Sequence, residues 1–380
     1  MSVYFQESGA RKTQLKRVLR LRYGDALRQD CTRVGGVPVF GSNGKFGEYA
    51  FANASSPVLI VGRKGSVGSI NWSPVPAFVS DTAFFVEPTS PETSKRWLFW
   101  LLQSLDLSAL SRDVGVPGLP RESAYRMTVI HPPLKDQLEI AAFLDSETAK
   151  IDEAIIEHRR LIDLIRERRQ IAIHCAVTKG INEDVALKNP ESDWSGAIPT
   201  HWRSVPLKRI VSMKSGQAIT ADALSDSNPY PVYGGNGVRG RASEFTHDGE
   251  YVLIGRQGAL CGNVHIASGK FWASEHAVVA TPKLKDTSAI WLAGMLEAAD
   301  LNRLSETAAQ PGLAVGKIGN LRCPLPPADE MEQIAISIKR ANETAQRLTD
   351  ALTHQLFLLQ ERRWALISDA VTGHFRRNSE

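Results

Sequence analysis

The chain has 380 residues, a formal net charge of +4 and 43% apolar residues, so two or three domains with sizeable cores are expected. Its longest apolar run falls short of the roughly 18 residues of a membrane span. Met1 is not followed by the charged and then apolar segments of a secretion signal. The mild positive charge permits an anionic partner but does not identify one.

The four cysteines, Cys31, Cys175, Cys261 and Cys323, are scattered along the chain. No pair has the spacing of a metal site or of a redox motif. A reducing cytoplasm is therefore the simplest expected location.

The N-terminal segment, residues 1–14, is polar and is predicted to be loose, without regular secondary structure. Basic residues begin there and continue beyond it: Arg11, Lys12, Lys16, Arg17, Arg20 and Arg22. A solvated face is the simpler interpretation of this run, and contact with phosphates is the functional one.

A block of short apolar runs cut by glycine follows: VPVFGSNGKFGEY (37–49), SPVLIVGRKGSVGSINW (56–72) and PAFVSDTAFFVEP (76–88). These runs, bounded by Gly, Asn, Ser and Pro, predict a curled sheet with tight turns. Residues 93–111 are then typical of a helix, 114–123 of a loop and 127–133 of a short strand that ends at two prolines.

One long helix is predicted over residues 134–180, because this stretch has no proline, and no glycine before Gly180. About 45 helical residues would extend roughly 65 Å. Mostly apolar or small residues recur in it at alternating spacings of three and four, which is a heptad seam. The seam consists of Thr148, Ile151, Ile155, His158, Ile162, Ile165, Arg169, Ala172 and Ala176.

After Gly180 a segment rich in Pro, Asn, Ser and Asp predicts a linker, and the pattern then starts again. Glycine turns, arginines, tryptophans and prolines recur at an offset of 193 or 194, as in Gly62-Arg63 with Gly255-Arg256 and Trp97 with Trp291. Seam positions recur in a second long helix: Asn342, Ala345, Thr349, Leu352, Leu356, Leu359, Arg363, Leu366 and Ala370. Landmarks kept in register over this distance indicate a duplicated unit.

We therefore predict an α+β protein with two pseudo-symmetric globular domains, joined by two long antiparallel helices that form a coiled coil. Its expected parts are domain 1 (1–133), a central helix (134–180), a linker (181–200), domain 2 (201–327), a C-terminal helix (328–375) and a tail (376–380).

Motifs for autonomous catalysis are missing from the sequence. Gly41–Phe46 is not a phosphate-binding loop, because Phe46 follows the lysine and Val39 stands where the first glycine is required. Asn228-Pro229-Tyr230 resembles part of an amino-methyltransferase motif, but it lacks the second proline, and a turn before a strand is favoured. The histidines form no metal motif. An enzyme that works alone is therefore not expected, and no catalytic or metal-binding residue is assigned.

The glycine turns instead carry hydrogen-bond donors of the kind that read base edges and neutralise phosphates. In the first block these candidate DNA-binding residues are Ser42, Asn43, Lys45, Arg63, Lys64 and Ser66. In the second block they are Asn236, Arg239, Arg241, Arg256, Gln257 and also Asn263. A structural alternative stays open for Arg63 and Arg256, which could tie their loops to a carboxylate. Asn43 and Asn236 could simply form Asn-Gly turns.

The long helices also carry arginines, among them Arg166, Arg168 and Arg362, which could face DNA, a globular block or a partner. Arg169 and Arg363 occupy equivalent seam positions. A polar seam residue often determines helix register at some cost in stability, and this is the preferred interpretation of the pair.

Several segments in combination resemble the specificity subunit of a type I DNA restriction–modification system. Residues 131–155 and 165–180 are similar to the family's central spacer helix. Trp194–Trp202 looks like the start of a second target recognition domain, of which the first block has no clear copy. The PVFGSNG (38–44) and PVYGGNG (231–237) turns, with the C-terminal copies at 325–338 and 358–373, complete the resemblance. It extends over nearly the whole chain.

This resemblance implies a non-catalytic subunit in which each globular block is a target recognition domain for one half of a split, asymmetric DNA site. The paired helices would keep the domains a fixed distance apart and dock two modification subunits. Those partners would bring S-adenosylmethionine and methylate adenine, and restriction subunits would bring ATP, Mg and cleavage. No cofactor is expected in this chain.

Two other interpretations stay open. One is a non-enzymatic scaffold that binds protein partners through its helices and makes no contact with DNA. The other is a self-sufficient nuclease or methyltransferase, against which the missing motifs argue.

Overall fold

A computed structural model describes residues 9–28, 32–111, 118–190, 192, 194–257, 261–284, 287–305 and 312–373, without the side chains of 32–34. The chain forms two compact units, and both dividing points lie within long helices. Unit 1 consists of Met1–His158 and Thr353–Glu380, and unit 2 of Arg159–Leu352.

Unit 1 is built around an antiparallel sheet ordered β2-β8-β5-β6, with β2 Leu19–Tyr23, β8 Ala83–Pro88, β5 Val58–Gly62 and β6 Ile70–Ser73. All five residues of β5 are buried, as expected for a strand at the centre of a sheet. A second sheet is ordered β4-β3-β7 (Gly44–Tyr49, Thr32–Gly41 and Phe78–Val79), and β1 (Arg11–Gln14) pairs with β9 (Thr128–His131). The short helices of unit 1 are η1 Leu15–Arg17, α2 Lys95–Ser104, η3 Ser108–Leu110 and α3 Arg121–Arg126.

Unit 2 repeats this topology with the sheets β13-β20-β17-β18 and β15-β14-β19-β16 and the pair β12-β21, and β16 adds a fourth strand to the second sheet. The strands are β12 Arg203–Pro206, β13 Val211–Ser215, β14 Tyr230–Gly234, β15 Gly237–Ala242, β16 His247–Asp248, β17 Tyr251–Gly255, β18 Val264–Ala267, β19 Lys270–Ala273, β20 Ala277–Pro282 and β21 Arg322–Leu325. The helices are η4 Leu207–Arg209, η5 Ala221–Ala223, α5 Ala289–Ala298, η6 Leu301–Leu304 and α6 Val315–Asn320.

Local details repeat as well, so the predicted duplication is confirmed. Ser94 and Ser288 cap α2 and α5 in the same way, each accepting a hydrogen bond from the backbone N–H of the tryptophan three residues later. Such a side-chain acceptor satisfies a donor that the helix start leaves unpaired. The backbones of Lys64 and Gly118 form an isolated antiparallel β-bridge, and those of Gln257 and Gly312 form the matching one.

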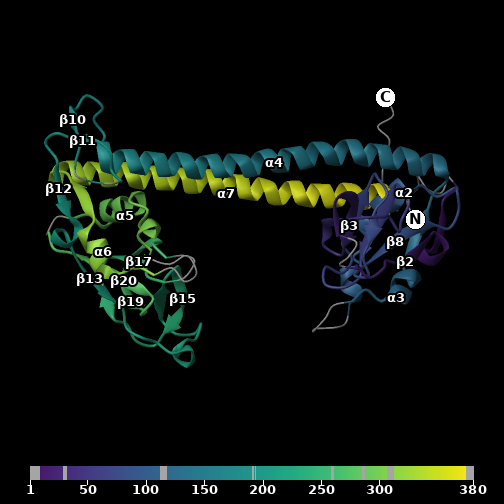
Figure 1. Ribbon diagram of the computed structural model, residues 1–380, viewed down its shortest axis with the longest axis horizontal. Coiled ribbons are helices and arrows are strands. Elements are labelled where there is room, and N and C mark those ends of the chain that lie inside the picture. The colour runs from purple at the N-terminus through teal and green to yellow at the C-terminus, as the bar shows by residue number, and fades with distance from the viewer. Residues whose placement is uncertain are drawn as a thin grey trace. The chain divides into compact units, whose positions relative to one another are not determined.

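The two long helices are α4 (Leu134–Lys179) and α7 (Ala328–Thr372), and each unit contains a part of both. In unit 1, Leu144 of α4 and Ile367 and Val371 of α7 enter one core. In unit 2, Val177 of α4 and Ile334 of α7 enter another. The start of one long helix and the end of the other thus complete each core, so the pair is antiparallel within each unit. α2 and α5 lie between this helix pair and the strands of their own unit (Figure 1).

Most of the predicted seam positions are shielded from solvent. Ile151, Ile155 and Ile162 are only 7 to 8% exposed. In α7, Ala345, Thr349, Leu352, Leu356 and Leu359 are each half-buried between two exposed neighbours. Ala172 is an exception, because it is exposed. Among the described residues, no helix combines the length and the hydrophobicity of a membrane span.

Two local predictions were wrong because contacts distant in sequence decide these segments. Residues 11–14 were expected to be loose, yet they form β1 and pair with β9. The loop predicted over 114–123 gives way to α3 at Arg121; residues 112–117 lie outside the described part of the chain.

The segment predicted as a linker is also structured in part. Leu187–Lys188 (β10) pairs with Ile198–Pro199 (β11). Ile198 is fully buried in the core of unit 2, beside Trp202. The Trp202 indole donates to the Glu330 carboxylate of α7 at 2.9 Å. Ile198 thus anchors the end of this segment in the core to which α7 contributes Ile334.

Candidate nucleic-acid interface

In unit 1 the two predicted glycine loops form one surface. The β3–β4 turn presents Ser42 and Asn43, and Gly44 follows with φ +101°, a conformation that suits glycine. The Ser69 hydroxyl donates to the Ser42 carbonyl, and the Ser66 hydroxyl donates to Asn43 Oδ1 at 3.4 Å. The loop after β5 is thereby held against the turn.

Most polar side chains on this surface point into solvent. Asn43, Lys45, Lys64 and Ser66 are exposed, and Ser42 is half-buried. Lys45 Nζ lies 3.8 Å from the Glu48 carboxylate, a long and exposed ion pair that leaves the ammonium largely hydrated. Such side chains can meet an anionic ligand without first breaking strong internal bonds.

Arg63 and Arg256 are held by equivalent positions of the two units. The Arg63 guanidinium donates to the Asp81 carbonyl at 2.9 Å and lies 4.7 Å from the centre of the Tyr23 ring. Arg256 donates to the Ser215 hydroxyl at 3.1 Å. Tyr23 ends β2 and Ser215 ends the matching β13. These contacts favour the structural alternative for both arginines, with a carbonyl, a ring and a hydroxyl in place of the expected carboxylate.

The corresponding surface of unit 2 carries different side chains. Asn263 Nδ2 donates to Asn236 Oδ1 at 2.8 Å, which joins its two loops. Gln257 is exposed, and its Oε1 lies 3.1 Å from His276 Nδ1. His276 Nε2 lies 3.1 Å from the Glu275 carboxylate. The sequence interpretation missed His276, although the same offset of 194 aligns it with Thr82 of the matching loop.

The side chains of the two arginines in β15 differ in exposure and in hydrogen bonding. Arg239 is exposed. Arg241 is half-buried; it donates through Nε to the Asn228 carbonyl at 2.6 Å and through a second nitrogen to the Pro229 carbonyl. Asn228 and Pro229 therefore act as the turn before β14, as the sequence interpretation favoured.

Two partly buried histidines of unit 2, His247 and His265, are shifted toward the neutral form. Burial lowers the pKa of His265 and of His247. A Cβ placed on Gly237 would lie 3.5 Å from the His265 ring, so this ring supports the Asn236 turn.

The basic run at the N-terminus is partly paired within unit 1. Arg22 Nε lies 2.7 Å from the Glu87 carboxylate, and Arg20 donates to the Lys16 carbonyl at 3.4 Å. Two of the six basic side chains thus have partners within unit 1. Among the described residues, no group of three or more His, Cys, Asp or Glu side chains could hold a metal ion.

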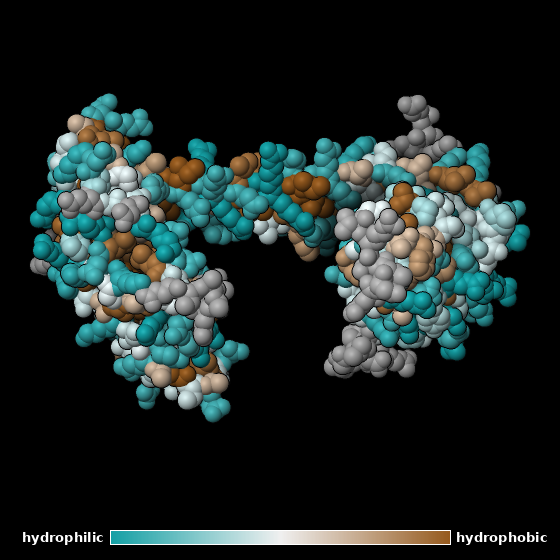
Figure 2. All heavy atoms as spheres, viewed as in Figure 1, coloured by the Kyte–Doolittle hydropathy of each residue, from teal (hydrophilic) through white to brown (hydrophobic). Residues whose placement is uncertain are grey.

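The long helices expose large apolar side chains away from their seam, visible as brown patches on a hydrophilic surface (Figure 2). In unit 1, Ile156 and Trp364 are both 63% exposed. In unit 2 a groove of about 420 Å³ between α4 and α7 is lined by Ile165, Ala172 and Leu348, among others. Apolar exposure of this kind typically marks protein-binding surfaces.

Comparison with known families gives two matches along the chain. Residues 8–159 and 199–356 both match the type I restriction modification DNA specificity domain. The specificity subunit of the Escherichia coli type I restriction enzyme EcoprrI is 41% identical over 148 residues, 38% of this chain and 37% of that protein. The MjaVIII specificity subunit of Methanocaldococcus jannaschii is 25% identical over 141 residues, 37% of this chain and 32% of that protein. The chain thus covers less than two fifths of either relative.

Solved structures share the fold over almost the full length. A chain from a study of complex assembly and conformational transition of the type I R-M system matches with a TM-score of 0.72, at 15% identity, over 96% of this chain and 98% of that one. The HsdS subunit of Thermoanaerobacter tengcongensis matches with a TM-score of 0.50, at 16% identity, over 97% of each chain.

Proposed function

We propose, from the premise that this chain belongs to the type I restriction modification DNA specificity family, that its two units each read one half of a split, asymmetric DNA site. The main support is the duplicated fold, in which one framework carries different donors at equivalent loop positions. Lys64 of unit 1 corresponds to Gln257 of unit 2, and Lys45 corresponds to Val238. Two copies of one recognition domain with different loop side chains suit two different half-sites.

Two groups of loop residues would have different roles in recognition. Exposed donors such as Asn43, Lys64, Arg239 and Gln257 would reach base edges or phosphates. The side chains of Arg63 and Arg256, which are hydrogen-bonded within their own units, would stabilise the conformation of the loops. Because Lys and Arg would neutralise phosphates, affinity should fall steeply with salt.

The long helices would act as a ruler and as a docking platform. Each is uninterrupted from Leu134 to Lys179 or from Ala328 to Thr372. As a coiled coil they would keep the half-sites at a fixed separation, so that the bases between them go unread. Their exposed apolar side chains would bind two modification subunits.

The chain itself would supply no chemistry. Modification subunits would bring S-adenosylmethionine and methylate adenine, and restriction subunits would bring ATP and Mg for translocation and cleavage. We expect the assembly to act in the cytoplasm, where its DNA substrate lies.

Domain exchange tests the proposal. Residues 201–327 are replaced by the matching block of another specificity protein, and methylated adenines are mapped across the host genome. One half of the recognised site should change while the other stays the same. The reciprocal exchange of residues 1–133 should alter the other half. A change in both halves after a single exchange would contradict modular reading.

A helical scaffold without DNA contact is the second candidate, favoured by the apolar surface on α4 and α7. Gel-shift experiments with the chain alone and with its modification subunits separate the two functions. A shift of specific DNA by the complex, weakened by salt, supports DNA reading. Stable complexes that shift no DNA at low salt support the scaffold.

A further inference from the structure

Arg169 joins three helices of unit 2. Its side chain, 28% exposed, extends from α4, and its Nε donates to Asn342 Oδ1 of α7 at 2.7 Å. Its two terminal nitrogens donate to Glu297 of α5, one to each carboxylate oxygen, at 2.6 and 3.0 Å. The predicted role in helix register therefore describes only the contact with Asn342.

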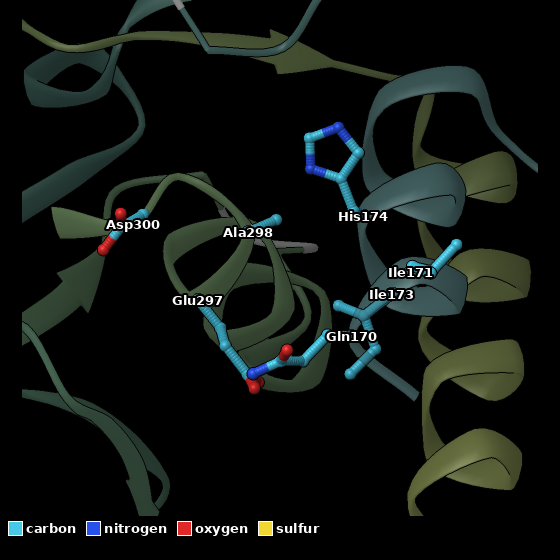
Figure 3. Close-up of a pocket in the computed structure, with 7 residues that line it drawn as sticks. All are labelled: Gln170, Ile171, Ile173, His174, Glu297, Ala298 and Asp300. Carbon is cyan, nitrogen blue, oxygen red and sulfur yellow. The ribbon is translucent and has the colours of Figure 1, made fainter. Parts of the chain in front are cut away.

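Glu297 belongs to the last turn of α5 and extends toward α4, where Gln170 lies beside it (Figure 3). After α5 the chain forms η6, Leu301–Leu304. A Cβ on Gly262 would lie 2.7 Å from the Asn302 backbone nitrogen, so η6 and the Gly262 loop touch. Asn263, the next residue, is hydrogen-bonded to Asn236. Few contacts thus separate Arg169 from the loops of unit 2.

Unit 1 has the same junction with its charges rearranged. Arg363 of α7 donates to Asp152 of α4 at 2.9 Å and to Gln103 of α2 at 3.3 Å. Gln103 is the counterpart of Glu297, at the repeat offset of 194. The carboxylate is therefore on α5 in unit 2 but on the other long helix in unit 1. Unit 2 attaches its short helix to this seam arginine through two ionic hydrogen bonds. In unit 1 the charged contact of the short helix is instead that of Arg96 with Asp145 of α4, at 2.8 and 3.0 Å.

The geometry of this contact suits orientation more than stability. Ion pairs that remain partly exposed contribute little to folding. A planar guanidinium bound through two nitrogens to two carboxylate oxygens nevertheless restricts the angle between the helices that carry them. Recurrence of the junction in both units indicates a role common to both.

We propose that Arg169 is a positioning residue for DNA recognition, which fixes the angle of the unit 2 loops on the helix pair and so sets the gap tolerated between half-sites. This inference rests on the proposed function. Arg363 has the same role in unit 1, with a weaker bond to the short helix.

The experiment uses the chain assembled with its modification subunits. Methylation rates are measured on DNA duplexes that carry both half-sites at the native gap and at gaps one base pair shorter or longer. Arg169→Met should reduce the preference for the native gap by about fivefold or more, as expected for the loss of a coupling contact. The sequence of each half-site should remain unchanged.

Two further variants make the result specific. Arg166→Met is the matched control, because Arg166 lies on the same helix, exposed and 3.3 Å from Asp163, and it should keep the native preference. Glu297→Gln installs the residue of unit 1 and should give an intermediate loss. Glu297→Gln replaces Arg169→Met as the test variant if thermal unfolding shows that Arg169→Met is misfolded.

An unchanged gap preference in folded Arg169→Met, or in Glu297→Gln if that variant must serve, would overturn the positioning role. A changed half-site sequence would also overturn it, because Arg169 would then act on base reading itself. If the wild-type complex methylates without regard to the gap, the proposed bipartite reading fails, and the inference fails with it.

Discussion

Gln137 shows how a single side chain can join two helices of unit 1. It is completely buried near the start of α4. Its Oε1 accepts the Ser94 backbone N–H at 2.8 Å, and its Nε2 donates to the carbonyls of Pro132, at 2.8 Å, and Glu92, at 3.2 Å. The starts of α2 and α4 are thereby connected. Met331 occupies the matching position in unit 2, so this contact belongs to one copy only.

Gln137→Met should lower the free energy of unfolding by about 1–3 kcal/mol, because it leaves a buried N–H and buried carbonyls without a partner. Urea denaturation of the full chain measures the change. Gln346→Met is the control; Gln346 is exposed and donates to Asp350 on the same helix. Equal stability of both variants would show that other groups satisfy the Gln137 partners.

At the scale of elements, the two short helices pack on the long helix pair in different ways. Gly294 lets α5 approach closely: a Cβ there would lie 2.8 Å from Ile338 Cδ1 and 3.2 Å from Ile173 Cγ2. In unit 1 the matching residue is Trp100, whose indole donates to Asp145 of α4 at 2.8 Å. The same fold thus uses close backbone approach in one copy and a large, hydrogen-bonded ring in the other.

Gly294→Val should destabilise unit 2 by about 1–3 kcal/mol, because the added methyl groups overpack the contact with α4 and α7. Gly316→Ala is the control in α6, where an added Cβ meets no atom within 4 Å. That change should be neutral or stabilising by up to about 1 kcal/mol. Thermal unfolding of the two variants checks this; similar losses in both would exclude packing as the cause.

At the scale of the whole molecule, the proposed ruler depends on the length of α4 and α7. Inserting one heptad into each helix, after His158 and after Leu352, keeps the seam in register. Seven residues add roughly 10 Å, which corresponds to about three base pairs at 3.4 Å each. Mapping of methylated adenines should then show a gap about three base pairs longer, with both half-sites unchanged.

The control adds seven residues after Glu183, in an exposed segment that follows α4. This insertion lengthens the chain but not the helices, so the gap should stay at its native length. If the heptad insertions also left the gap unchanged, α4 and α7 would not determine the spacing.

Prediction from sequence succeeded where neighbours along the chain decide the structure. The spacing of Ile151, Ile155 and Ile162 indicated the buried seam, because residues three and four apart share one helix face. Glycine turns were recognised from composition alone. The repeat offset revealed the duplicated fold without any knowledge of contacts.

The tertiary structure alone decided which partner each side chain has. The sequence placed Arg63 and Arg256 among the DNA-binding residues, with a structural role as the alternative. The contacts with Asp81, Tyr23 and Ser215 favour that alternative. Arg169 was recognised as a seam residue, but its bond to Glu297 joins positions 128 residues apart. The physical reason is range: periodicity and turn chemistry act within a few residues, whereas the partner of a long polar side chain depends on which distant segments folding brings together.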